Sequence, residues 1–182
     1  MKRERRMHDI SPFKKARGNL CMPIVLVTAE HDGIRNIMTA AWSTPASFEP
    51  PLIIICIGYS RATHDLILKS GECGINVLSE EQVDLANYCG NISGREVNKF
   101  QEMKIPLRSS TVITAPLVEG CACNIELKVN SHFQSGDHTC FVGETVNYYE
   151  DPSKLPLVRF RGLYYRIAEN LGEVQHSSIR TG

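Results

Sequence analysis

The sequence lacks the features expected of a metal-binding, disulfide-bonded or membrane-spanning protein. Its seven cysteines include no Cys-x-x-Cys pair, and an odd number of cysteines without a secretory signal indicates free thiols in a reducing compartment. The six histidines are scattered, without the spacing of zinc ligands. No apolar stretch approaches the roughly 20 residues that a membrane span requires, and no apolar segment follows the N-terminal charges as in a signal peptide. We therefore expect no metal, no membrane partner and a cytoplasmic location.

The charge is balanced, with 20 basic and 20 acidic residues, so electrostatics does not favour a nucleic-acid partner. Lysine and arginine are nevertheless concentrated in the first 17 residues. A terminus of this composition is typically a solvated segment, the alternative being a basic arm. We predict a flexible charged leader over residues 1–18, a single domain over 19–172 and a polar tail over 173–182.

The layout is rich in strands. The apolar and alternating segments predict strands over residues 24–28, 34–41, 52–57, 72–78, 123–129 and 139–149. Short helices are expected over 63–69, over 80–88 with a cap of Ser79 and Gln82, and over a segment reaching Phe100 with a cap of Ser93 and Glu96. Short strands with few helices in this order predict a mainly β protein built as a closed antiparallel barrel.

The most informative segment runs from Asn36 to Asp65. Small and hydroxyl-bearing residues fill positions 39–47, an apolar strand follows at 52–57, and a second polar cluster, containing Arg61, occupies 58–64. Small residues let backbone amides approach a flat ligand closely, and a guanidinium among hydroxyls suits a phosphate. A planar slot beside an anion site favours a flavin mononucleotide (FMN). The alternative is an ordinary buried strand between two polar loops.

Several motifs occur in the same order as in a known family. Residues 36–42 read NIMTAAW, 47–51 read SFEPP, 60–64 read SRATH, 74–78 read GINVL, 93–100 read SGREVNKF and 136–144 read GDHTCFVGE. This pattern, over about residues 20–165, resembles the flavin reductase-like family, which includes the flavoredoxins and the small reductase components of two-component monooxygenases. The resemblance implies an FMN-binding split barrel and a homodimer in which a second chain completes the site.

The residues and the resemblance together nominate the cofactor site. The wall of the ring and the ribityl chain is expected from Thr39, Ala40, Ala41, Trp42, Ser43, Thr44 and Ser47. Ser60, Arg61 and Thr63 are the phosphate candidates. The resemblance adds Lys99 near the phosphate, and His64 and Asn76 from the matching motifs. Trp42 could instead fill the core, and Lys99 could be a solvated lysine at a helix end.

The resemblance also implies that NADH or NADPH reduces the bound flavin and that the electrons pass to an acceptor protein. The sequence contains no Gly-x-Gly-x-x-Gly, so a Rossmann nicotinamide domain is not expected. His138 is the candidate catalytic residue near the flavin; the alternative is a strand-end histidine bonded to Asp137 or to solvent. A flavoredoxin-type electron carrier, a non-catalytic FMN-binding module and a barrel without a ligand remain alternatives.

Overall fold

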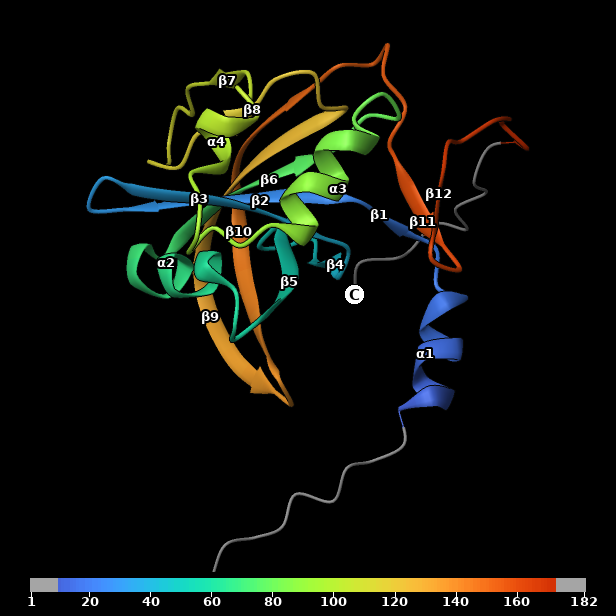
Figure 1. Ribbon diagram of the computed structural model, residues 1–182, viewed down its shortest axis with the longest axis horizontal. Helices are drawn as coiled ribbons and strands as arrows, with labels where there is room; N and C mark the ends of the chain where they lie inside the picture. Colours follow the sequence, from blue (N-terminus) through green and yellow to red (C-terminus); the bar gives the residue numbers. More distant parts are fainter. Residues whose placement is uncertain (1–9, 173–182) are drawn as a thin grey trace, which may run out of the picture.

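The computed structural model describes residues 10–172, and an antiparallel sheet of seven strands forms its main body (Figure 1). Along the sheet the strands follow the order β3-β2-β6-β9-β10-β5-β4. Their bounds are β2 Val25–His31, β3 Ile34–Ala40, β4 Ser43–Ser47, β5 Leu52–Gly58, β6 Glu72–Val77, β9 Cys123–Ser135 and β10 His138–Glu150. The helices beside it are α2 Ala62–Ser70, α3 Val83–Asn91 and α4 Lys99–Glu102, and a small ladder joins β7 Leu107–Arg108 to β8 Leu117–Val118.

A separate arm projects from this body (Figure 1). It contains α1 Ser11–Gly18 and a three-stranded sheet of β1 Met22–Pro23, β11 Val158–Phe160 and β12 Leu163–Tyr165. The backbone N–H of Arg161 donates to the carbonyl of Gly18 at 2.7 Å, which ties the β11–β12 turn to the end of α1. The expected flexible leader therefore contains a helix. Residues 1–9 and the tail 173–182 lie outside the described residues, and the division into leader, domain and tail stays a prediction.

The prediction of a mainly β chain with a few short helices is confirmed. All pairings in the large sheet are antiparallel, and the register between β5 and β10 places Gly58 opposite His138. Within residues 10–172 the ladder ends at β3 on one side and β4 on the other. Closure of the sheet into a barrel therefore stays a prediction.

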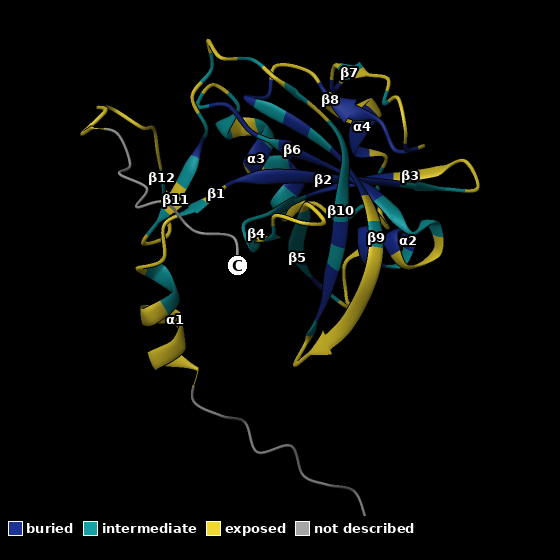
Figure 2. Cartoon of the chain, turned by 180° about the vertical axis from the view of Figure 1, so that it is seen from behind, coloured by how far each residue is buried: buried dark blue, intermediate teal, exposed yellow. Residues whose placement is uncertain are grey.

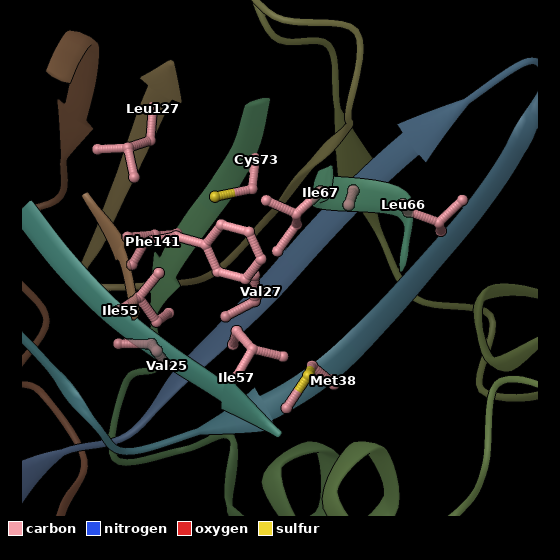
Figure 3. Close-up of a cluster of buried hydrophobic side chains, with 12 residues drawn as sticks. Val25, Val27, Met38, Ile55, Ile57, Leu66, Ile67, Cys73, Leu127 and Phe141 are labelled. Carbon is pink, nitrogen blue, oxygen red and sulfur yellow. The ribbon is translucent and has the colours of Figure 1, made fainter. Parts of the chain in front are cut away.

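The core has two parts because β2 is buried on both faces (Figure 2). Successive strand residues point to opposite faces. Val25 and Val27 accordingly join one cluster, which contains Phe141 and is covered by α2 (Figure 3). Leu26 joins a second cluster, covered by α3 and α4. α2 and α3 cover opposite faces of the sheet, and both contact β3, the strand at the end of the ladder.

Two predicted helix caps are wrong. The amide oxygen of Gln82 accepts the backbone N–H of Ser79 at 3.0 Å, but α3 begins only at Val83, and the buried Ser79 hydroxyl has no hydrogen-bond partner among the described residues. The helix expected from Ser93 begins instead at Lys99, because Asn98 supplies the cap by accepting the N–H of Gln101 at 3.3 Å. No helix among residues 10–172 is long and apolar enough to cross a membrane.

Candidate functional site

Two hollows lie at the free edge of β3, between the start of α2 and the second half of α3. The inner hollow, which we call the cradle, has a volume of about 80 Å³ and is lined by Asn36, Met38, Thr39, Ser60, Arg61, Ala62, Thr63, Cys89, Gly90, Asn91, Ile92, Ser93, Gly94 and Lys99. The outer hollow, which we call the groove, has a volume of about 340 Å³. Thr39, Arg61, Gly90 and Asn91 line both hollows, so the two adjoin one another.

Lys99 places a buried positive charge in the cradle. Its ammonium donates to the carbonyls of Ile37 at 2.8 Å and Cys89 at 3.0 Å, and an ammonium has a third donor beyond these two. Burial lowers the pKa of Lys99, and the charge of Arg61 acts in the same direction. An anion in the cradle would counter both effects, because it favours the charged form of the lysine. The alternative of a solvated helix-end lysine is wrong, since the residue is only 3% exposed.

Arg61 is the residue that precedes α2, and its side chain makes no cap hydrogen bond. It is exposed, and among the described ion pairs none involves it. The first backbone N–H groups of a helix carry a partial positive charge and suit an anion. Asp65, in the same turn, is paired with Arg95 at 2.7 Å, which lowers the pKa of Asp65 and offsets its charge. The cradle therefore has a positive potential.

Thr63 and Gly94 fix the shape of the cradle. The Thr63 hydroxyl accepts a hydrogen bond from the Asn36 amide at 3.1 Å, which ties the start of α2 to β3. A Cβ at Gly94 would lie 2.0 Å from the Asn36 side-chain oxygen, so only glycine lets this loop approach so closely. The contacts of Thr63 and Gly94 with Asn36 therefore fix the shape of the cradle.

Small residues form the wall of the groove. Thr39, Ala40 and Ala41 line it from β3 and the residue that follows. The Thr39 hydroxyl donates to the carbonyl of Ala86 at 2.7 Å, and a Cβ at Gly90 would lie only 3.4 Å from the Thr39 Cβ. The backbone of α3 is thus held close to β3, and the wall leaves room for a flat ligand.

Trp42 and His138 form a stacked pair that lines neither the cradle nor the groove. Their ring centroids are 4.6 Å apart with an interplanar angle of 30°. The His138 Nδ1 lies 2.6 Å from a carboxylate oxygen of Asp137, and this hydrogen bond lowers the pKa of Asp137. The bond to Asp137 agrees with the alternative of a strand-end histidine bonded to its neighbour. The other contact of the imidazole is with the Trp42 ring. The catalytic role of His138 stays a prediction.

The other predicted cofactor residues line neither hollow. Ser43, Thr44 and Ser47 belong to β4, which begins three residues after the end of β3, and their role in binding a cofactor stays a prediction. His64 is buried, with its Nε2 2.8 Å from the Thr139 hydroxyl.

Asn76 is also buried, and its amide oxygen accepts hydrogen bonds at 2.8 Å from the Val118 N–H and the Asn124 amide. In this chain His64 and Asn76 bond within the core, and any role of theirs in binding a cofactor stays a prediction. Within residues 10–172, no three His, Cys, Asp or Glu side chains gather to hold a metal.

Sequence reasoning missed the residues that the arm contributes. Arg159 from β11 and Tyr164 from β12 line the outer groove, together with Gly162 from the turn between them. The available signal was the alternating segment from Val158 to Tyr165 with an Arg-Gly turn in its middle, which is typical of a hairpin. This hairpin is far along the chain from the other site residues, so the sequence did not indicate that it lines the groove.

The chain belongs to the flavin reductase-like domain family, whose model matches residues 17–168. It is 38% identical over 112 residues to an uncharacterized protein of Archaeoglobus fulgidus, a match that covers 62% of this chain and 63% of the relative. The chain therefore spans less than two thirds of the length of that relative.

Two further matches carry functional descriptions. The chain is 30% identical over 158 residues to the reductase subunit HsaB of a flavin-dependent monooxygenase from Mycobacterium tuberculosis, a match covering 86% of this chain and 81% of that protein. A crystal structure of an FMN-binding protein from Thermus thermophilus with bound p-hydroxybenzaldehyde superposes with a TM-score of 0.78 at 30% identity, covering 85% of this chain and 91% of the other.

Proposed function

We propose that this protein is an FMN-dependent oxidoreductase that takes electrons from NADH or NADPH and passes them to an acceptor protein. The observation that carries the proposal is the cradle. It combines two cations without carboxylate partners among the described residues with the start of α2, and it adjoins a groove that has small residues along one wall. We further propose that the sheet closes into the split barrel that the family resemblance implies.

The residues present fit the cofactor. Ser60, Arg61, Lys99 and the first turn of α2, which contains Thr63, would hold the phosphate, since charge-assisted hydrogen bonds to a dianion are strong. Thr39, Ala40 and Ala41 lie along the flat ring system and keep bulky side chains away from it. A bound flavin supplies the hydride and electron chemistry, while the protein supplies its position and electrostatic environment.

The relatives support two versions of the function. HsaB is a reductase subunit of a flavin-dependent monooxygenase, which favours an oxygenase component as the acceptor. The Thermus thermophilus structure is described as an FMN-binding protein, which favours a carrier or binding module without its own nicotinamide site. We place the reductase first because the family model that matches residues 17–168 is the flavin reductase-like domain.

An absorption measurement separates these functions. The purified protein titrated with FMN should show the absorption spectrum of bound flavin. Anaerobic NADH or NADPH should bleach this spectrum at least as fast as the protein oxidises the nucleotide in steady-state turnover. Bound flavin that resists both nucleotides but is reduced by dithionite would leave the carrier or binding module. No binding of FMN would contradict the proposal in all its forms.

Substitution of His138 tests the stacked pair. His138→Ala should slow flavin reduction by NAD(P)H about tenfold, the worth of one hydrogen bond to the reacting partners, while FMN affinity changes little. The measurement is the rate of flavin reduction by stopped flow, compared between the wild type and the variant. His132→Ala, an exposed histidine on β9, is the matched control. An unaltered rate would leave His138 as a partner of Asp137 and Trp42 only.

A homodimer is also proposed. Phe48, next to β4, is 97% exposed, and half-buried Leu52 and Ile54 lie on the adjoining strand. Exposed apolar side chains of this size favour a protein interface. Light scattering at micromolar concentration should give the mass of two chains. A monomer that still binds FMN would contradict this.

A further inference from the structure

Two cysteines lie side by side on the neighbouring strands β5 and β10. The register places Cys56 directly opposite Cys140, and their Sγ atoms are 3.3 Å apart. Both are free thiols. Ile55 and Phe141, the chain neighbours of the two cysteines, belong to a buried core cluster, so both thiols lie on the other face of the sheet. Cys56 is half-buried and Cys140 is buried, so a reagent from solvent would reach Cys56 first.

The backbone spacing of this pair suits a bond between the two sulfurs. The N–H of Cys56 donates to the carbonyl of Trp42 at 2.9 Å, on the side of β5 that faces away from β10. Cys56 and Cys140 are therefore a non-hydrogen-bonded pair of the antiparallel ladder, in which the Cα atoms lie about 4.5 Å apart. Disulfides span Cα distances of about 4.4–6.8 Å and have an S–S bond of about 2.05 Å. The sulfurs need to approach one another by roughly 1 Å, which small rotations of the two side chains provide.

The surroundings of Cys56 affect how such a bond would form and break. Burial raises the pKa of the Cys56 thiol to about 12, and the hydrogen bond with Cys140 acts in the same direction. Because the thiolate is the form that attacks a disulfide, the reduced pair should exchange slowly at neutral pH. A dithiol whose thiolate is not stabilised also forms a disulfide that is hard to reduce.

We propose that Cys56 and Cys140 form a reversible dithiol–disulfide site whose substrates are low-molecular-weight disulfides. The site is a two-electron redox centre made of side chains alone, so it does not rest on the binding of a flavin. Its oxidised form joins β5, which leads to Ser60 and Arg61 of the cradle, to β10, which begins at His138.

The reaction with glutathione disulfide balances in two exchanges. The Cys56 sulfur, after losing its proton, attacks one sulfur of glutathione disulfide, and the first glutathione leaves and takes up that proton. The Cys140 sulfur then attacks the Cys56 sulfur of the mixed disulfide, and the second glutathione leaves with the proton of Cys140. One S–S bond forms and one breaks, the protein loses two protons and two electrons, and glutathione disulfide gains them as two thiols.

Equilibration of the full-length protein in glutathione buffers tests the site. Samples that start from reduced and from oxidised protein are held at each ratio of oxidised to reduced glutathione until their composition stops changing, so slow exchange does not affect the result. Free thiols are then blocked, and the protein is digested and analysed by mass spectrometry. A peptide pair joined through Cys56 and Cys140 should rise from a trace to most of the protein as the ratio increases, and dithiothreitol should remove it.

Two substitutions complete this experiment. Cys140→Ser should abolish the joined peptide and leave glutathione attached to Cys56. Cys123→Ser, which removes another half-buried cysteine of the same sheet, is the matched control and should leave the joined fraction unchanged. The inference is overturned if wild-type Cys56 carries glutathione without joining Cys140, or if both cysteines stay unmodified at equilibrium.

Urea unfolding shows whether the folded sheet accommodates the bond. A disulfide restricts the unfolded chain, so the joined protein should unfold at a urea concentration higher by about 1 M than the reduced protein. Cys140→Ser given the same oxidising treatment should show no such shift. A joined protein that unfolds at the same or a lower urea concentration would mean that the bond forms only by distorting the sheet, which also overturns the inference.

Discussion

Replacement of Arg61 by alanine is expected to weaken FMN binding on the order of ten- to a hundredfold while leaving riboflavin binding unchanged. The difference arises because only FMN carries a phosphate, and a charge-assisted hydrogen bond to that group contributes about 1.5–3 kcal/mol. Fluorescence titration of both flavins with the same protein preparation measures the difference directly. Equal weakening of the two ligands would place Arg61 outside the phosphate site.

Arg61 suits this test because its substitution should change the charge of the cradle without disturbing the fold. Among residues 10–172 its side chain makes no hydrogen bond, ion pair or ring contact, so alanine removes the charge without removing such a contact. Lys69→Ala, at the other end of the same helix, is the matched control, because it removes an exposed positive charge far along the helix from the cradle. Lys99 is less suitable, since its ammonium also joins the carbonyls of Ile37 and Cys89, and its loss would loosen β3 from α3.

The parts of the fold that the sequence predicted well depend on local patterns. The apolar run at β5 and the Ser-Gly end of α2 define those elements through burial and through the left-handed conformation at Gly71, whose φ is +70°. The cradle was predicted in part for the same reason. Ser60, Arg61 and Thr63 are neighbours in the chain, so the helix that follows them necessarily brings them together.

The parts that were missed depend on contacts between distant segments. Thr39 is bonded to Ala86, and Lys99 is buried against Ile37, although nothing near them in the sequence encodes those partners. His64 and Asn76 belong to matching motifs, yet their polar atoms bond inside the core. A motif records that a residue type is needed at a position, whereas only the packing shows whether it faces a ligand or its own backbone.

Glu126 is the residue whose loss should cost the most stability. Its side chain is fully buried on β9, and its oxygens accept the backbone N–H groups of Thr111 at 2.8 Å, Val112 at 2.6 Å and Ile113 at 3.0 Å. These bonds hold the irregular segment between β7 and β8 against the sheet. Glu126→Gln keeps one acceptor oxygen but turns donors toward N–H groups that are themselves donors. Unfolding in urea should show a loss of about 2–3 kcal/mol at neutral pH.

The pH dependence gives this prediction a definite sign. Burial alone would raise the pKa of Glu126, but the backbone N–H donors lower it below its ordinary value. Because the pKa is lower in the folded protein, the carboxylate stabilises the fold above its unfolded pKa, and this contribution is lost as pH falls through the folded pKa. The stability curves of the wild type and Glu126→Gln should therefore converge in acid and diverge toward neutral pH. Glu96→Gln, an exposed glutamate, should follow the wild type throughout. A gap between wild type and Glu126→Gln that stays constant with pH would mean that the charge of Glu126 does not hold the segment.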